Sequence, residues 1–205
     1  MEAMRANPLV IFCSPRGGSS LVAGAFVNHG FWVGETFGGP DGRGTGGYVN
    51  HENTKIKKWM KDFYPLNAGI PNYPFPAGDL RQACGRIVPQ DEPWLFKGPS
   101  EYYPVFRYHF PLMNAVMVFR DRSQAVEAHV RRRGEKVRQN ASVIVRQRYD
   151  YMEARLKDDP LAFRVDADRL VNGDSTQLAP VLAEYGLTLD HRLAVKDISS
   201  GMFHQ

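Results

Sequence analysis

A short run of small and polar residues near the start of the chain is best suited to chemistry on an anion. Arg16 precedes two glycines and then Ser19 and Ser20, in the heptapeptide SPRGGSS. Glycines let the backbone curl around an anion, and the N–H groups at the start of a following helix attract negative charge. A guanidinium can add two parallel hydrogen bonds. The segment therefore predicts a site for a phosphate- or sulfate-bearing group.

Other interpretations of this loop stay open on the residues alone. A nucleoside triphosphatase loop needs the spacing GxxxxGK, whereas here the cation, Arg16, comes before the glycines. The same residues also suit a plain turn from a strand into a helix, with Ser19 or Ser20 as the capping residue. The loop thus indicates an anion without identifying it.

A second arginine, Arg120, follows a short apolar run in the segment NAVMVFRDRSQAVEAHVRRRG. Ligands of open α/β sheets bind at the carboxyl ends of strands, where we expect Arg120 and Ser123. Two strand-to-helix turns that each carry an arginine indicate a ligand with two separate anionic ends. The alternative is that Arg120 pairs with a structural carboxylate such as Asp121. We interpret the triple arginine at 131–133 as a solvated helix end.

The elements that must position these residues alternate between short apolar runs and helical patterns. The expected strands are Leu9–Cys13, Trp94–Lys97, Ala115–Phe119 and Ala162–Val165. The expected helices are Ser19–Asn28, Asn53–Phe63, Ser123–Arg133, Ala141–Leu156 and Ser175–Tyr185. This alternation predicts a three-layer α/β/α fold with a central parallel sheet. The segments 38–47 and 65–78 are rich in Gly or Pro, and they are either binding loops or surface insertions.

Composition limits the classes of protein to which the chain can belong. Its 205 residues are 43% hydrophobic and carry a net charge of +4, which predicts one domain over residues 1–205 and suits an anionic ligand. So small a charge gives no reason to expect nucleic acid as a partner. No apolar run reaches the roughly 20 residues of a membrane span. With two cysteines and no apolar leader, we expect a reducing, cytoplasmic location.

With both turns in view, the chain resembles the sulfotransferases that use PAPS (3′-phosphoadenosine 5′-phosphosulfate). The 5′-phosphosulfate loop of that family reads Pro, Lys or Arg, Ser, Gly and two hydroxyl residues. The chain matches it at Pro15, Arg16, Gly18, Ser19 and Ser20. Gly17 stands where the family has serine, which removes one hydroxyl but keeps the turn. The first turn is therefore similar to a donor-binding loop.

The second turn and three further segments are similar to the same family, in the same order along the chain. VMVFRDRSQAVEAHV looks like its 3′-phosphate segment, with Arg120 at its arginine. The family usually has a serine eight positions later, where this chain has Ala128. Ser123 or a nearby arginine is the expected substitute. The other segments are GGYVNHENTKIKKW, WLFKGPS with Lys97 at the family's lysine, and FRVDADRLVNGD.

This resemblance implies a P-loop-like sulfotransferase fold of the bacterial-type branch. It implies transfer of a sulfuryl group from PAPS to a hydroxyl or amine of a small-molecule or carbohydrate acceptor, leaving adenosine 3′,5′-bisphosphate, without a metal ion. Arg16 and Lys97 are the implied catalytic cations. The implied donor-binding residues are Arg16, Gly17, Gly18, Ser19, Ser20, Arg120 and Ser123.

The resemblance leaves the acceptor base and the activity open. Glu52 lies at the family's acidic position and is our first choice, followed by His51 and Glu35. A P-loop nucleotide kinase and a non-catalytic relative that binds adenosine 3′,5′-bisphosphate are the alternative functions. Aromatic residues of the middle third, among them Trp59 and Phe63, either line an acceptor pocket or pack loops onto the core.

Overall fold

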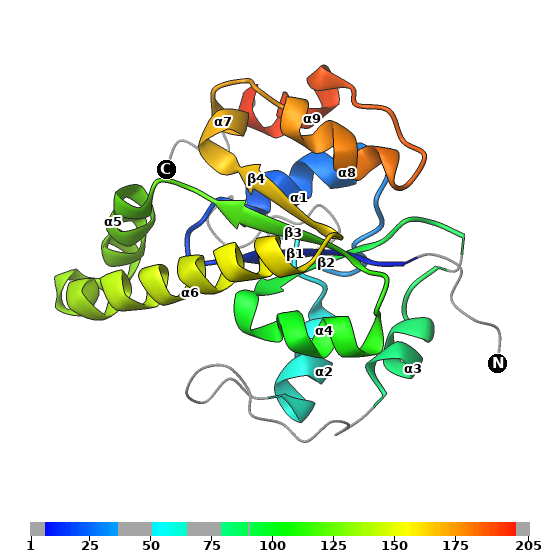
Figure 1. Ribbon diagram of the computed structural model, residues 1–205, viewed down its shortest axis with the longest axis horizontal. Coiled ribbons are helices and arrows are strands. Elements are labelled where there is room, and N and C mark those ends of the chain that lie inside the picture. Colours follow the sequence, from blue (N-terminus) through cyan, green and yellow to red (C-terminus); the bar gives the residue numbers. More distant parts are fainter. Residues whose placement is uncertain (1–6, 37–50, 65–78, 90, 200–205) are drawn as a thin grey trace.

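A parallel sheet of four strands organises the computed structural model, which describes residues 7–36, 51–64, 79–89 and 91–199 (Figure 1). Its spatial order is β2, β1, β3, β4. The strands are β1 (Leu9–Cys13), β2 (Leu95–Pro99), β3 (Asn114–Phe119) and β4 (Ala162–Asp166). The expected strands are confirmed, with ends that differ by no more than two residues.

Helices cover both faces of the sheet and so confirm the three-layer α/β/α architecture (Figure 1). One face carries α1 (Ser19–Asn28), α7 (Ala167–Val171), α8 (Ala179–Ala183) and α9 (His191–Ser199). The other carries α2 (Thr54–Phe63), α3 (Leu80–Gly85), α4 (Tyr103–His109) and α6 (Arg138–Asp158). The helix α5 (Arg122–Arg133) follows β3 and packs against α6. Short 3₁₀ turns are η1 (Ser100–Tyr102), η2 (Glu135–Val137) and η3 (Thr176–Leu178).

The strands are buried on both faces because successive side chains point to opposite layers. In β1, Val10 and Phe12 join the apolar cluster formed with α2, α4 and α6. Leu9 and Ile11 join the cluster formed with α1, α8 and α9. The same alternation directs Lys97 of β2 toward the layer of α1, since its neighbour Phe96 packs in the opposite layer. A charged side chain is thereby placed inside the domain.

The helices agree less well with the sequence-based expectation than the strands do. The expected helix Ser175–Tyr185 is instead the 3₁₀ turn η3 followed by α8. Pro180 lies at the start of α8, where its missing N–H breaks the hydrogen-bond ladder and a new helix begins. The short helices α3, α4, α7 and α9 were not expected. No helix among the described residues is long and apolar enough to cross a membrane.

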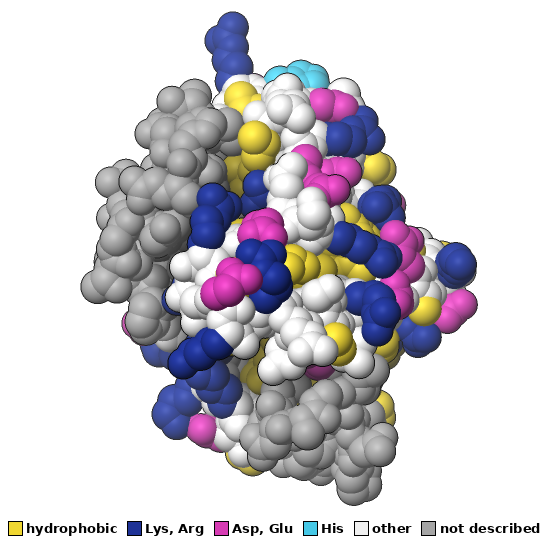
Figure 2. All heavy atoms as spheres, turned by 90° about the vertical axis from the view of Figure 1, so that its left-hand side faces the viewer, with side chains coloured by type: hydrophobic (Ala, Val, Ile, Leu, Met, Phe, Trp, Pro, Cys, Tyr) yellow, Lys and Arg dark blue, Asp and Glu magenta, His cyan; other side chains and the backbone are white. Residues whose placement is uncertain are grey.

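The carboxyl ends of the strands form the face of the molecule on which the predicted site residues converge. The arrowhead of β3 points to the left in Figure 1, and Figure 2 turns that side toward the viewer. Lys and Arg side chains are spread over this face, with Asp and Glu side chains among them. The Gly- or Pro-rich segments 38–47 and 65–78, expected to be loops, lie outside the described residues.

Candidate active site

The loop between β1 and α1 depends on its glycines. The N–H of Gly17 donates to the carbonyl of Ser14 at 3.1 Å, which closes the turn. Gly18 has φ 83°, and a Cβ there would overlap the Cβ of Ala167 on α7. Arg16 also lies in the left-handed region, with φ 62°, a conformation that costs a side-chain-bearing residue energy. The loop is therefore a tight, strained turn pressed against α7.

The first turn of α1 faces the site with its N–H groups. Gly18 is the N-cap residue, and no side chain caps this end of the helix within the described chain. The carbonyl of Gly18 accepts from Leu21 and Val22, at 3.1 and 3.3 Å. The N–H groups of Ser19 and Ser20 precede the first helical hydrogen bonds and suit an incoming anion. The geometry thus agrees with the predicted anion loop.

Lys97 brings a buried ammonium to this helix end. Only 5% of its side chain is exposed. Its Nζ donates to the hydroxyl of Ser20 at 2.8 Å and lies 3.7 Å from Oε1 of Glu52. Burial lowers the pKa of Lys97, while the nearby Glu52 opposes that change. Three residues chosen from the sequence, Ser20, Glu52 and Lys97, therefore meet at one place.

Glu52 is held between two lysines just before α2. Oε1 faces Lys97, and Oε2 bonds to Lys57. Burial raises the pKa of Glu52, but Lys97 and Lys57 together outweigh burial, so the pKa is lowered from its ordinary value. Glu52 is thus a carboxylate at neutral pH, paired with the buried Lys97 on one side and with Lys57 on the other.

The two other candidate bases lie in different surroundings. His51 is 6% exposed, and its buried Nε2 has no hydrogen-bond partner among the described residues. Burial, aided by Lys97, lowers the pKa of His51 to about 4, so the imidazole is neutral at pH 7. The carboxylate of Glu35 is 71% exposed and pairs with Lys55 at 3.3 Å. Of the three, the structure brings Glu52 into contact with Lys97.

Arg120 lies on the same face of the molecule, at the end of β3, and it is already bound within the protein. Its Nε donates to Asp168 of α7 and to Gln124, both at 3.1 Å. The carboxylate partner is Asp168 rather than Asp121, the partner considered in the sequence. Asp121 instead caps α5 and accepts the hydroxyl of Ser123. Both predicted 3′-phosphate residues therefore have internal partners in this structure.

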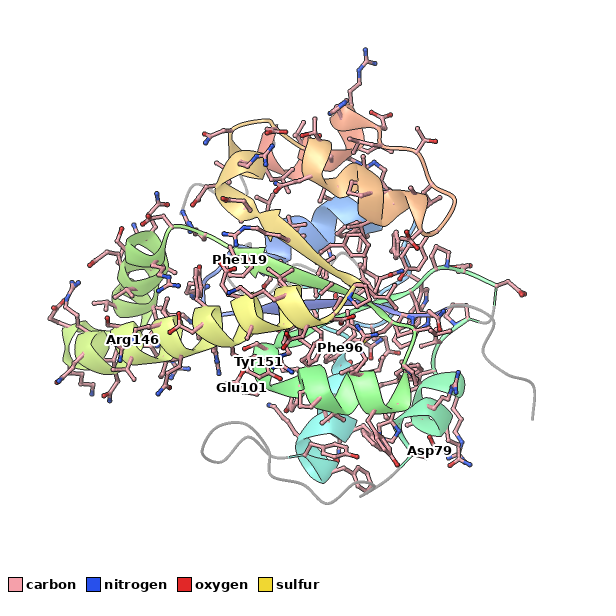
Figure 3. The ribbon with its side chains drawn as sticks, in the orientation of Figure 1. Asp79, Phe96, Glu101, Phe119, Arg146 and Tyr151 are labelled. Atoms are coloured by element: carbon pink, nitrogen blue, oxygen red, sulfur yellow. The ribbon has the colours of Figure 1, made fainter. Side chains whose placement is uncertain are left out.

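A polar hollow of about 350 Å³ adjoins Arg120 at the carboxyl ends of β3 and β4. Residues that line it include Arg120, Arg122, Arg164 and Asp168. Phe119, labelled in Figure 3, forms part of its wall, and the guanidinium of Arg164 stacks 4.0 Å from the centre of that ring. The hollow is lined by both guanidinium and carboxylate groups. This lining suits a polar ligand but gives no net preference for an anion.

Some residues of this face were missed in the sequence. Nε of Arg148 on α6 donates to Glu101 at 2.7 Å, in a partly buried ion pair between α6 and η1. Figure 3 shows Glu101 beside α6, close to Tyr151. The pKa of His129, the neighbour of Ala128, is lowered by burial and by Arg133 and Arg16, so α5 adds positive charge near the loop. No spacing in the sequence indicates these contacts, because they join separate elements.

The described aromatic residues of the middle third are divided between core and surface. The ring of Trp59 packs 4.7 Å from that of Phe63 and 5.7 Å from that of Tyr64, centre to centre. Tyr64 is fully buried, whereas Phe63 is 42% exposed. Trp59 and Phe63 line a hollow of about 360 Å³ between α2 and α3. They are therefore accessible to a ligand, while Tyr64 belongs to the core.

Comparisons with known proteins concern the fold. No family model matches the chain, and no curated protein matches it in sequence. Among solved structures, the chain is similar to the sulfotransferase domain from the Synechococcus PCC 7002 olefin synthase, with a TM-score of 0.61 and 17% identity. The match covers 94% of this chain and 78% of that one. The three-layer fold expected from the sequence is thus one that a sulfotransferase domain adopts.

Proposed function

We propose that the protein moves a sulfuryl group from PAPS to a hydroxyl or amine of a small-molecule or carbohydrate acceptor. The observation that carries the proposal is the 2.8 Å hydrogen bond from Nζ of Lys97 to the hydroxyl of Ser20. It places a buried ammonium at the start of α1, beside the anion loop. Burying a lysine is costly, and burial lowers the pKa of Lys97 despite Glu52 at 3.7 Å, so a transferred anionic group would stabilise the ammonium further.

The described residues have clear parts in such a transfer. Arg16 and the N–H groups at the start of α1 would hold the 5′-phosphate and transferred group, and Lys97 would bond the sulfuryl or bridging oxygen. The acceptor oxygen or nitrogen forms a bond to sulfur as the bond from sulfur to the phosphate oxygen breaks. The electron pair of that bond leaves with adenosine 3′,5′-bisphosphate. Positioning and charge stabilisation supply the catalysis, and one donor aimed at the developing charge contributes about 3 kcal/mol.

We propose that Glu52 is the base that takes the proton from the acceptor hydroxyl or amine. Its carboxylate is ionised, adjoins Lys97 and is 23% exposed, so an acceptor can reach it. A carboxylate of lowered pKa is a weak base, but a loose transition state requires little deprotonation of the acceptor before attack. His51 is the alternative base, although its Nε2 is inaccessible in this conformation.

Binding tests the proposal first. Adenosine 3′,5′-bisphosphate should raise the melting temperature, whereas ATP with Mg²⁺ should not. Arg16→Ala should strongly reduce this stabilisation without changing the melting temperature of the ligand-free protein by more than a few degrees. Arg192→Ala, an exposed arginine on α9, is the matched control. An equal response to ATP with Mg²⁺ would instead favour a nucleotide kinase.

Turnover tests the proposal second. PAPS with a panel of hydroxyl and amine acceptors should yield adenosine 3′,5′-bisphosphate and sulfated product. Because Arg120 is paired with Asp168, the donor would be held mainly at its loop end and be less well positioned for transfer, so a protein that binds the bisphosphate without turnover is the second candidate function. Binding without turnover on any acceptor would support that candidate, and no binding at all would exclude both.

A further inference from the structure

Glu52 is shared by two ammonium groups that come from different elements. Lys97 of β2 lies 3.7 Å from Oε1, and Lys57 of α2 bonds to Oε2. Exposure increases along this row, from 5% for the side chain of Lys97 to 23% for Glu52 and 38% for Lys57. Each carboxylate oxygen thus has its own cation, and the row runs from the anion loop toward solvent.

The start of α2 fixes Lys57 in this row. Asn53 is fully buried; its side chain caps the helix by accepting from the N–H of Ile56 at 2.9 Å and donates to the carbonyl of Val33 at 2.8 Å. Ile56 and Met60 are buried and set the rotation of the helix. The N–H of Lys57 bonds to the carbonyl of Asn53 at 3.0 Å. Lys57 therefore lies in the first turn of a firmly docked helix.

The neighbouring lysines of the same helix point elsewhere. Lys55 pairs with Glu35, and Lys58 pairs with Asp62 at 2.7 Å. Lys58 is 77% exposed, so its ion pair lies in solvent. Lys57 differs from them because its partner belongs to the candidate active site. This difference supplies a control on the same helix.

The two ammonium groups hold Glu52 differently. Lys57 hydrogen-bonds to Oε2, whereas Nζ of Lys97 lies at ion-pair distance from Oε1, 3.7 Å away, and donates its 2.8 Å hydrogen bond to Ser20. One carboxylate therefore offsets part of the charge of both lysines. Because Lys57 holds one oxygen, the other stays beside Lys97 and the start of α1.

We infer that Lys57 is a positioning residue for the proposed transfer: it holds one oxygen of Glu52 and so aims the carboxylate at the acceptor. This inference rests on the proposed function. Other titratable groups near Glu52 include His51, which precedes it in the chain, and the thiol of Cys13. Burial lowers the pKa of His51 to about 4 and raises that of Cys13, so both are uncharged near neutral pH.

The test compares Lys57→Met, Lys57→Arg and the control Lys58→Met. In Lys57→Met, turnover of PAPS with the best acceptor of the panel should fall about tenfold at neutral pH, because Glu52 loses its orientation. The acid limb of the pH–rate profile should move up by about one pH unit, because one of the two cations that lower the pKa of Glu52 is gone. Lys57→Arg should restore the acid limb, and Lys58→Met should leave it unchanged.

Two independent measurements separate failure of this inference from failure of the proposed function. Adenosine 3′,5′-bisphosphate should bind Lys57→Met within about threefold of the unsubstituted protein, since Lys57 contacts Glu52 and is 38% exposed, whereas the bisphosphate is proposed to lie on the anion loop. A carbon-13 NMR titration of the Glu52 carboxyl should show the same upward shift without any acceptor.

Suppose that Lys57→Met turns over PAPS with the same acid limb and the same Glu52 carboxyl titration as the unsubstituted protein. That result would overturn this inference and leave the proposed function standing. Absence of PAPS turnover in the unsubstituted protein would overturn the proposed function, and with it the catalytic part of the inference. A shifted titration accompanied by a shifted acid limb would support both.

Discussion

At the carboxyl ends of β1 and β2, Lys97 directs its ammonium to the start of α1, whereas beyond β3 the guanidinium of Arg120 is bound to Asp168. The first cation donates to a hydroxyl at 2.8 Å and has its carboxylate, Glu52, at 3.7 Å, whereas the second bonds its carboxylate at 3.1 Å. An anion that reaches Lys97 can replace a neutral hydroxyl, but one that reaches Arg120 must replace a directly bonded carboxylate. We therefore expect the proposed two-ended ligand to be held more tightly on the loop side.

Lys97→Met is expected to give the largest effect and tests the loop side directly. The apolar side chain fits the buried site but cannot bond the transferred group, so PAPS turnover should fall at least about a hundredfold. Circular dichroism should show an intact fold. A loss of only a few-fold, measured as kcat/KM, would place Lys97 outside the machinery.

Gly18→Ala tests the contact that links the two sides, because Gly18 packs against α7, the helix that carries Asp168. The substitution combines the strain of φ 83° with an overlap on Ala167, and we expect the free energy of unfolding to fall by about 3 kcal/mol. Gly30→Ala has φ 96° but open space around the new Cβ, and it should cost only about 1 kcal/mol. Urea unfolding measures both, and equal losses would argue against tight packing at Gly18.

Arg16→Ala and Arg120→Ala compare the two sides by ligand affinity. We expect adenosine 3′,5′-bisphosphate to bind Arg16→Ala about thirtyfold more weakly, but Arg120→Ala only about threefold more weakly, because Arg120 is partly neutralised by Asp168. Isothermal titration calorimetry provides both values. The reverse order would show that Asp168 gives up Arg120 readily and that the second end of the ligand dominates binding.

His51→Gln concerns stability rather than affinity, and its effect is expected only below neutral pH. The pKa of His51 is lowered from 6.5 to about 4, so the unfolded chain binds its proton more tightly than the folded protein. Stability should therefore fall as the pH drops from about 6.5 toward 4, by about 2 kcal/mol between pH 7 and pH 5. Replacement by Gln should remove this part of the pH dependence. Urea unfolding at the two pH values measures this loss. An equal loss of unfolding free energy in both proteins would contradict the lowered pKa of His51.

The sequence predicted the parts of the molecule that depend on local pattern. Buried parallel strands are short apolar runs, so their positions could be read directly, and Arg16 and Ser20 follow from the turn after the first run. The helix expected at Ser175–Tyr185 was wrong in its length because Pro180 starts a separate helix there. Local pattern was thus sufficient for the sheet and loop, but less so for the helices.

Pairings between distant elements could not be predicted from the sequence. Arg120 and Asp168 are 48 positions apart, and Asp168 lies on α7, a helix too short to show a periodic pattern. Lys57 appears in the sequence as one of several lysines on an amphipathic helix. Only the docking of α2 through Asn53 shows that it faces Glu52. The roles of individual charges therefore emerge from the packing of the elements.

The left-handed backbone of Arg16 sets the proposed anion binding against backbone stability at a single residue. A glycine would adopt φ 62° without steric strain, whereas the backbone of arginine at this position costs the fold about 1 kcal/mol. Selection for thermal stability alone would therefore favour glycine on backbone grounds, at the expense of the proposed contact between the guanidinium and an anion. Screens for stabilised variants of this protein should accordingly hold position 16 fixed.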